Sequence, residues 1–499
     1  MTESSLPMLI TWDRLVLYAA VALTGAAVMV LEILGTRILA PFYGTSLIVW
    51  TALITVTLVA LAVGYFLGGW LAGRTILSLA DILAIAGVTC ALIPLLANPV
   101  LVMTDPLGLH LGALVSATLL FALPLSLLAM VGPWIIHLSC RHHEQAGVTS
   151  GTVYAISTLG SVAGTLGLSF YLLPVFGSHF LLGSLGIVLL GLSAVLFGWQ
   201  AKRLRQPWRP IWLIVAAVFV IGALYLSKAT YSKALFQRES LYGKIAVVDD
   251  KKRNARWLLA DASIIGGIDL TTGQSRLAYQ DLVIEALSIH PLAQDALLIG
   301  LGAGTLVPKL SQRGLAVDVI EIDPAVAEAA ARYFGFRPPG KLWLADARTQ
   351  VRQIPHLYDL IIHDCFTGGS EPVHLLTQEA FQDLRAKLRP EGVLLLNFVG
   401  FRQGPGRQAL DAVWRTLRSV FSQVEALATD PEADFNDFLL LASEQPIKLS
   451  DNLVSYRLNS APSAGPIVSD DHNPLDLLQR QKAKTYRAVL FAQVGELFL

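Results

Sequence analysis

The residues best suited to chemistry lie at the ends of two apolar runs in the second half of the chain. The run that begins at Ala296 ends in three alternating glycines, Gly300, Gly302 and Gly304, and a second run ends at Glu321. Glycines let a backbone approach a nucleotide closely, and a carboxylate about 20 residues further on can accept hydrogen bonds from both ribose hydroxyls. The strand context, the spacing and the acid together predict a nucleotide site.

Two further carboxylates follow apolar runs of the same kind. Asp346 and Asp364 each come directly after a short run that we interpret as a strand. In an open α/β sheet the ligand lies beyond the carboxyl ends of the strands. We therefore expect residues 300–305, Glu321, Asp346 and Asp364 to meet at one edge of a sheet.

The elements that position these residues alternate between strands and helices. Such alternation predicts a parallel, doubly wound sheet of about seven strands between residues 296 and 445. Further strands are expected at 342–345, 359–363, 392–398 and 437–442, and helices at 277–289, 324–334, 376–388 and 406–420. Upstream, residues 238–249 and 256–261 alternate and are rich in β-forming residues, which predicts a small additional sheet.

The first half of the chain has a different character. Of the 499 residues, 54% are hydrophobic and only 15% are charged, which is too apolar for an ordinary soluble enzyme. Uncharged stretches between Leu15 and Leu226 are about 20 residues long, the length of a transmembrane helix. We expect spans near 15–35, 47–70, 77–98, 111–136, 150–173, 180–199 and 210–227. The predicted fold is an all-α membrane bundle of about seven helices, followed by a Rossmann-like α/β domain.

Small and polar residues recur within these spans. Glycines spaced for close helix packing are Gly64, Gly68, Gly69 and Gly73, and Gly160, Gly164 and Gly167. Glu32 and Arg37 either pair near the interface and orient the first helix, or mark a functional site, because charges in hydrocarbon are costly. The polar residues after the fourth span are His137, His142, His143 and Glu144, and we interpret them as solvated loop residues.

Other features limit the partners that the chain can have. The formal net charge is +0, so nothing supports a nucleic-acid partner, and the lipid bilayer is the expected environment. Cys90, Cys140 and Cys365 show neither a pairing pattern nor a metal-ligand spacing, so we expect reduced thiols and no metal. The first span is too long for a signal peptide and lacks a small-residue cleavage site.

Several motifs of the second half occur in a recognisable order. They are Glu239-Ser-Leu-Tyr-Gly243, Tyr279-Gln-Asp281, residues 300–305, Glu321-Ile-Asp323, Asp346-Ala347 and residues 358–364. With these motifs the chain resembles the spermidine synthase family, the polyamine aminopropyltransferases built on the fold of S-adenosylmethionine-dependent methyltransferases. The first half is similar to the multi-span region fused to this domain in bacterial membrane homologues, most clearly over residues 24–37 and 151–174.

The resemblance implies a transferase with S-adenosylmethionine or its decarboxylated form as co-substrate. The implied cofactor-binding residues are Gly300, Gly302, Gly304, Glu321, Asp346 and Ala347. Glu321 would hold the ribose hydroxyls, and Asp346 would accept a hydrogen bond from the adenine amino group. Tyr279 and Gln280 would contact the acceptor.

Asp364 is the implied catalytic residue. In an in-line displacement at a sulfonium, the attacking amine must lose a proton as the new bond forms. A carboxylate within hydrogen-bond reach can take that proton and orient the nitrogen.

Three acids that the family would place around a diamine are missing here, and their positions hold Ala303, Ser275 and Thr367. A diamine such as putrescine carries two positive charges, and a buried site for it needs carboxylates to offset desolvation. The substitutions argue against spermidine synthesis but leave the adenosyl half of the site unaffected. Glu371, Asp281 and Asp261 are candidates to replace the missing acids.

Three functions follow from these observations. The first is a spermidine synthase-like transferase acting on a small-molecule amine. The second is a methyltransferase acting on a membrane-associated acceptor, which the missing acids favour. The third, from another class, is a transporter or sensor whose adenosyl domain is regulatory, and a homodimer is a possible assembly for any of them.

The expected organisation is a transmembrane domain (1–230), a small β subdomain with a connecting helix (231–295), the adenosyl-binding domain (296–475) and a helical tail (476–499). A multi-pass protein of the bacterial inner membrane is expected. Arg14, Arg74, Arg141 and the basic cluster of residues 202–209 fall on one side of a seven-span topology, which the positive-inside rule makes cytoplasmic. That places the C-terminal domain outside, unless one segment fails to cross. We expect a cytoplasmic C-terminal domain because an adenosyl co-substrate is found there.

Overall fold

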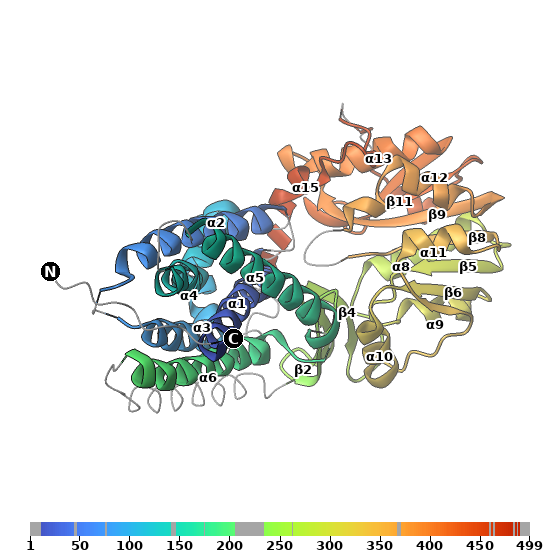
Figure 1. Ribbon diagram of the computed structural model, residues 1–499. Coiled ribbons are helices and arrows are strands. Elements are labelled where there is room, and N and C mark those ends of the chain that lie inside the picture. Colours follow the sequence, from blue (N-terminus) through green and yellow to red (C-terminus); the bar gives the residue numbers. More distant parts are fainter. Residues whose placement is uncertain are drawn as a thin grey trace. The chain divides into compact units, whose positions relative to one another are not determined.

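The computed structural model describes residues 11–43, 47–74, 77–140, 146–173, 175–204, 234–261, 263–366, 371–458, 461–462, 465–482, 485–486 and 488–489. The chain divides into two compact units, Met1–Ser232 and Lys233–Leu499. In its described part the first unit is helical, and the second contains the strands (Figure 1).

The helices of the first unit are long and apolar. They are α1 (Thr11–Tyr43), α2 (Leu47–Leu71), α3 (Leu79–Thr104), α4 (Gly108–Ser139), α5 (Ala146–Gly167) and α6 (Ser178–Leu204). The short helix η1 (Asp105–Leu107) joins α3 to α4, and the π-helical turn η3 (Leu168–Leu172) extends α5. Within the described residues, five apolar segments are long enough to cross a bilayer, and one of them, Leu79–Ser139, contains both α3 and α4. The expected spans up to residue 199 therefore coincide with helices, whereas the span at 210–227 lies outside the described residues. Membrane insertion itself stays a prediction.

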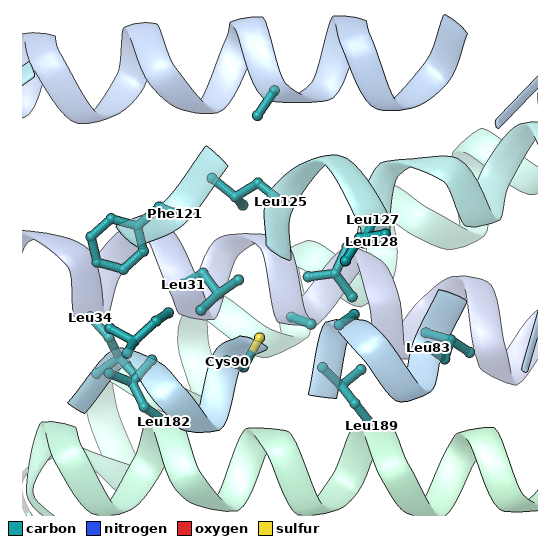
Figure 2. Packing of buried hydrophobic residues seen from close by; sticks show 14 of the residues in the cluster. Leu31, Leu34, Leu83, Cys90, Phe121, Leu125, Leu127, Leu128, Leu182 and Leu189 are labelled. Atoms are coloured by element: carbon teal, nitrogen blue, oxygen red, sulfur yellow. The ribbon is translucent and has the colours of Figure 1, made fainter. Parts of the chain in front are cut away.

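Side chains from all six of these helices share one hydrophobic core. Those labelled in Figure 2 are Leu31, Leu34, Leu83, Cys90, Phe121, Leu125, Leu127, Leu128, Leu182 and Leu189. Glycines bring other helices into backbone contact. A Cβ at Gly68 of α2 would overlap the Met130 backbone of α4, and one at Gly160 of α5 would overlap the Ala22 backbone of α1. The packing role predicted for these two glycines is confirmed.

A partly buried ion pair joins α1 to α6. Asp13 is 1% exposed and accepts hydrogen bonds from the Trp199 indole at 2.9 Å and from the Arg203 guanidinium at 3.0 Å. The pair fixes the relative register of the two helices. Glu32 and Arg37 both lie on α1, and their role stays a prediction. The residues from His142 to Glu144 lie outside the described residues.

The second unit begins with a four-stranded antiparallel sheet. Its strands are β1 (Ala234–Glu239), β2 (Lys244–Asp250), β3 (Ala255–Ala260) and β4 (Ser263–Asp269), in that order. The small sheet predicted from the alternating residues is thus present, and one of its faces packs on α10 (Pro324–Tyr333).

A seven-stranded sheet with the order β10-β11-β9-β8-β5-β6-β7 forms the rest of the unit. Its strands are β5 (Asp295–Ile299), β6 (Ala316–Glu321), β7 (Leu342–Leu344), β8 (Tyr358–His363), β9 (Leu388–Phe401), β10 (Gln423–Ala428) and β11 (Phe435–Ser443). Residues 297–299 are almost fully buried, as expected of a strand covered on both faces. The strand order changes direction between β5 and β8, which is where an open α/β sheet places its ligand.

The sheet is mixed, so the prediction of an all-parallel sheet was wrong at one edge. β11 is antiparallel to β9 and to β10. The strand at 423–428 was also missed in the sequence, because a hairpin partner rather than its own composition makes it a strand. The remaining strands are parallel and are joined through helices, as predicted.

Helices cover both faces of this sheet. They are α8 (Tyr279–Ala286), α9 (Leu306–Gln312), α10, α11 (Ala347–Gln353), α12 (Gln378–Arg385), α13 (Gln408–Val420), α14 (Asp451–Ser455) and α15 (Leu475–Leu478). Short 3-10 helices η4 (Leu287–Ile289), η5 (Val373–Leu375) and η6 (Pro405–Arg407) connect them. Asp323 and Asp346 cap the first turns of α10 and α11, so two of the predicted functional segments are also helix starts.

Candidate active site

A cavity of about 730 Å³ opens at the carboxyl ends of the central strands. The predicted site residues that line it are Tyr279, Gly300, Gly302, Glu321, Asp346, Ala347 and Asp364. They come from α8 and from the segments that follow β5, β6, β7 and β8. The predicted meeting of these residues at one edge of the sheet is therefore observed, although their functional roles remain predictions.

Glu321 is placed at the end of β6 by two backbone donors. The Leu301 N–H donates to its Oε2 at 3.0 Å, and the Asp323 N–H donates to its Oε1 at 2.8 Å. Burial raises the pKa of Glu321 to about 7, although these hydrogen bonds oppose the effect. An ionised carboxylate has about four acceptor sites, so each oxygen can accept one more hydrogen bond. The two oxygens are thus able to accept from a vicinal diol.

The glycine turn is closely packed against its neighbours. Gly300 and Gly302 have φ values of +92° and +53°, which disfavour any side chain. A Cβ at Gly300 would overlap the Asp364 carbonyl, and one at Gly302 would overlap the Ile265 carbonyl. Gly304 lies against the Phe336 ring and is not among the residues that line the cavity. Packing alone accounts for these glycines, and the cavity adds space for a ligand beside the first two.

Asp346 has one carboxylate oxygen committed to the fold. Its Oδ1 accepts from the Thr349 N–H at 2.9 Å, while its Oδ2 lies 3.6 Å from His374 Nε2. Burial raises the pKa of Asp346, but the Thr349 hydrogen bonds and His374 outweigh it, so the pKa lies below its usual value. Asp346 is therefore an anionic acceptor at the cavity wall, with Ala347 beside it.

Asp364 is held by two neutral donors. The Tyr279 hydroxyl donates to its Oδ2, and the Asn397 amide donates to its Oδ1 at 3.0 Å. Burial raises the pKa of Asp364, the two hydrogen bonds lower it, and nearby Glu371 raises it again, with a net increase. A carboxylate with a raised pKa and a fixed orientation is suited to accept a proton.

Gln280 faces the glycine turn. It exchanges hydrogen bonds with the Thr305 hydroxyl at 3.0 and 3.1 Å and is 4% exposed. It is not among the residues that line the cavity, unlike its neighbour Tyr279. In this arrangement it braces the turn, and contact with an acceptor stays a prediction.

The sequence analysis missed three polar residues of the site. Asn397 of β9 and Asp437 of β11 line the cavity, and Lys482 lies behind its wall. Burial, with the charges of Asp364 and Glu371, raises the pKa of Asp437 to about 6. An acid and an amide inside otherwise apolar strands were the available signals, because buried polar residues in strands are rarely there for packing alone.

The residues that stand in place of the three expected acids have different surroundings. Ala303 is 3% exposed and belongs to the hydrophobic cluster beneath the small sheet, against Gly266. Ser275 accepts from the Leu277 N–H at 3.2 Å beside the cavity. Thr367 lies outside the described residues.

None of the three proposed replacement acids lines the cavity, but Glu371 accepts a hydrogen bond from the N–H of Val399, which does. Asp281 pairs with Lys309 at 2.7 Å on an exposed surface, and Asp261 accepts from the Lys244 N–H at a turn of the small sheet. Among the described residues, no group of three or more histidine, cysteine, aspartate or glutamate side chains is arranged to hold a metal ion.

Comparison with known proteins agrees with the motifs. No family model matches the chain. It is 30% identical over 234 residues to an N-terminal histidine N-methyltransferase of Emericella nidulans, covering 42% of this chain and 41% of that protein. It is 32% identical over 152 residues to a polyamine aminopropyltransferase of Vibrio vulnificus, covering 29% of this chain and 49% of the relative. Further polyamine aminopropyltransferases and a spermidine synthase also match. Over part of its length the chain is therefore similar to polyamine aminopropyltransferases and spermidine synthases.

The likeness has clear bounds. The chain spans about half the length of these two relatives, 41% and 49%. The solved structure of a probable spermidine synthase from Corynebacterium glutamicum aligns at 17% identity and a TM-score of 0.39, covering 50% of this chain and 93% of that one. The named relatives are transferases, as the motifs predict. A fused N-terminal region is compatible with the share of the chain that these relatives leave unmatched.

Proposed function

We propose that this chain is a membrane-anchored transferase that binds an adenosyl sulfonium co-substrate and transfers a group to an amine. The observation that carries the proposal is that Glu321 and Asp364 both line the same cavity. Glu321 has acceptor capacity for a ribose diol, and Asp364 is a positioned base. The first is suited to hold a nucleoside, and the second to receive a proton from an incoming nitrogen.

The adenosyl half of the cavity would be formed by Glu321, Asp346 and the glycine turn. Glu321 would accept from the ribose hydroxyls, and Asp346 would accept from the adenine amino group with Oδ2. The turn at Gly300 and Gly302 would leave room for the sulfur-bearing chain. S-adenosylmethionine and its decarboxylated form share this nucleoside, so this half fits both.

The transfer half would run an in-line displacement. The lone pair of the neutral amine attacks the carbon bonded to the sulfonium, a C–N bond forms, and the C–S bond breaks with its electron pair left on sulfur. The nitrogen then carries a positive charge and loses its proton to the Asp364 carboxylate. Tyr279 and Asn397 hold that carboxylate in place throughout. Positioning and proton transfer are the contributions expected of the protein.

Two arginines on the same cavity favour methyl transfer as the second candidate. Arg253 and Arg276 line it, paired with Asp250 at 2.9 Å and Asp269 at 2.6 Å. Guanidinium groups in the cavity wall would suit a donor that keeps its carboxylate. We therefore expect decarboxylated S-adenosylmethionine to have no advantage over S-adenosylmethionine, and putrescine to be a poor acceptor.

Steady-state assays with both donors decide between the two transfers. The purified full-length protein in detergent would be given each donor with a panel of mono- and diamines, and the products would be identified by mass spectrometry. Methylated amines formed from S-adenosylmethionine would support methyl transfer. Aminopropylated amines formed from the decarboxylated donor would support aminopropyl transfer. Robust spermidine formation from putrescine would contradict our interpretation of Ala303 and Ser275.

For the first unit we propose a multi-pass anchor in the bacterial inner membrane with the α/β unit in the cytoplasm. Five apolar segments of spanning length support the anchor. The need for a cytosolic co-substrate supports the orientation.

A further inference from the structure

The C-terminal segment carries a cation into the interior of the α/β unit. Lys482 is 1% exposed, and its ammonium donates to the carboxylate of Glu371, which is equally buried. Lysine is almost never fully buried without a partner. This pair is therefore a specific feature of the site's surroundings.

The ammonium is enclosed as a bound cation would be. It lies 4.3 Å from the centre of the Phe398 ring and 5.6 Å from that of Phe366. Burial lowers the pKa of Lys482, and the charges of Glu371 and the neighbouring Asp437 oppose that effect and favour the ammonium. Carboxylates and aromatic faces around a desolvated ammonium are the groups that proteins use to recognise amine ligands.

The pair lies directly behind the cavity wall. Phe366, Asp437 and Tyr486 all line the cavity, and the Phe366 and Tyr486 rings pack edge to face at 4.9 Å. Lys482, Tyr486 and Val489 are spaced as on one face of a helix, and the described residues around them are helical. The C-terminal segment thus supplies both part of the wall, through Tyr486 and Val489, and the ammonium of Lys482 behind it.

We propose that Lys482 takes the place of an acceptor's second ammonium on Glu371 and thereby selects acceptors with a single amine. This inference rests on the proposed function, because it concerns the acceptor of that same cavity. With Lys482 in place, Glu371 is unable to pair with a ligand cation. A second ligand ammonium would also be repelled by the lysine, a repulsive element of the kind that gives binding sites their specificity.

The remaining carboxylates have other tasks. Asp364 is bonded to Tyr279 and Asn397 and is the proposed proton acceptor. Asp437 lines the cavity and already interacts with the Lys482 ammonium. Burial, with the charges of nearby carboxylates, raises the pKa of Asp437 to about 6, which weakens its hold on any cation in acid. Glu371 would be the strongest additional cation partner, and Lys482 occupies it.

Binding of 1-aminobutane and 1,4-diaminobutane to the full-length protein in detergent tests the inference. In the wild type, we expect the monoamine to bind at least as tightly as the diamine. Lys482→Ala should leave space beside Glu371 and free its carboxylate. The diamine should therefore bind to this variant at least about tenfold more tightly than it binds to the wild type, which is the scale of one charge-assisted hydrogen bond. Glu371→Gln/Lys482→Ala should lose this gain. Lys309→Ala, which removes a partly buried lysine from its pair with the exposed Asp281, is the matched control and should not change the preference.

Several results would overturn the inference. A wild-type protein that binds the diamine tenfold more tightly than the monoamine would refute the inference. This measurement needs no variant, so it holds even if Lys482→Ala fails to fold. An unchanged diamine affinity in a folded Lys482→Ala protein, or a gain that persists with Glu371→Gln, would also refute it. S-adenosylhomocysteine binding in the same samples separates the two proposals, since its absence would count against the adenosyl site and not against the amine preference.

Discussion

Glutamine at position 321 should weaken adenosyl binding and remove its pH dependence. The two oxygens of Glu321 each accept one backbone hydrogen bond, at 3.0 and 2.8 Å, and in the proposed complex each would accept one more from the ribose. Glutamine keeps a single acceptor oxygen and presents an N–H₂ group where the other acceptor stood. Replacing charge-assisted hydrogen bonds in this way should cost about 1.5–3 kcal/mol, or roughly 10- to 150-fold in Kd.

The pKa of Glu321 supplies the second part of this prediction. Burial raises that pKa to about 7, and only the ionised form can accept from both hydroxyls. Between pH 8 and pH 6 the ionised fraction of such a group falls about tenfold, so the wild-type affinity should fall by about the same factor as the pH is lowered.

Isothermal titration of methylthioadenosine into the full-length protein at pH 6, 7 and 8 measures both effects. Methylthioadenosine has no group that titrates in this range. Glu391→Gln, on the exposed first part of β9, is the matched control. The reasoning would be refuted by a Glu321→Gln protein that binds as tightly as the wild type, or by one that keeps the full wild-type pH dependence.

The proton acceptor, a buried histidine and the membrane topology each allow a further test. Asp364→Asn should lower kcat by about 10²–10⁴-fold in the transfer assay, because the proton acceptor is lost, while S-adenosylhomocysteine affinity changes little; equal losses in both would show a structural role instead. Burial lowers the pKa of His363 to about 4, so the unfolded state binds more protons than the folded state below pH 6.5. The contribution of His363 to the free energy of unfolding should therefore be fully present above pH 6.5 and fall by up to about 3 kcal/mol as the pH approaches 4. In denaturant titrations, His363→Leu should remove most of that fall, and an unchanged fall would exclude the histidine as its source. A reporter enzyme fused after Leu499 should be active in the cytoplasm, and activity only in the periplasm would reverse the proposed orientation.

Local patterns in the sequence are enough to predict which residues meet in the proposed adenosyl half of the site. Glu321, Asp346 and the glycine turn each follow an apolar run, and the carboxyl ends of parallel strands necessarily share one edge of a sheet. Periodicity alone therefore predicts that residues following β5, β6, β7 and β8 lie together. The small sheet and the helices up to residue 204 are predictable for the same reason, because their apolar residues repeat at the period of the element.

The acceptor half depends on pairings that local patterns do not encode. Asp437 reaches the cavity because β11 runs antiparallel to β9, a direction that the strand's own residues do not specify. Lys482 lies 111 positions from its partner Glu371, and nothing near either residue indicates the pair. In the sequence, Ala303 stands at one of the positions where an acid was expected, whereas in the structure it packs into a hydrophobic cluster.

These two halves differ in what they can discriminate. The proposed adenosyl half presents backbone-fixed carboxylates that would suit any adenosyl thioether, so we expect it to constrain the donor only weakly. The acceptor half contains three acids, Asp364, Glu371 and Asp437, and one buried lysine. Removing the charge of Lys482 makes the acceptor half more negative and leaves Glu321 unchanged. Donor affinity and acceptor preference should therefore vary independently among variants, and a variant at Lys482 that altered both would show that the two halves are coupled.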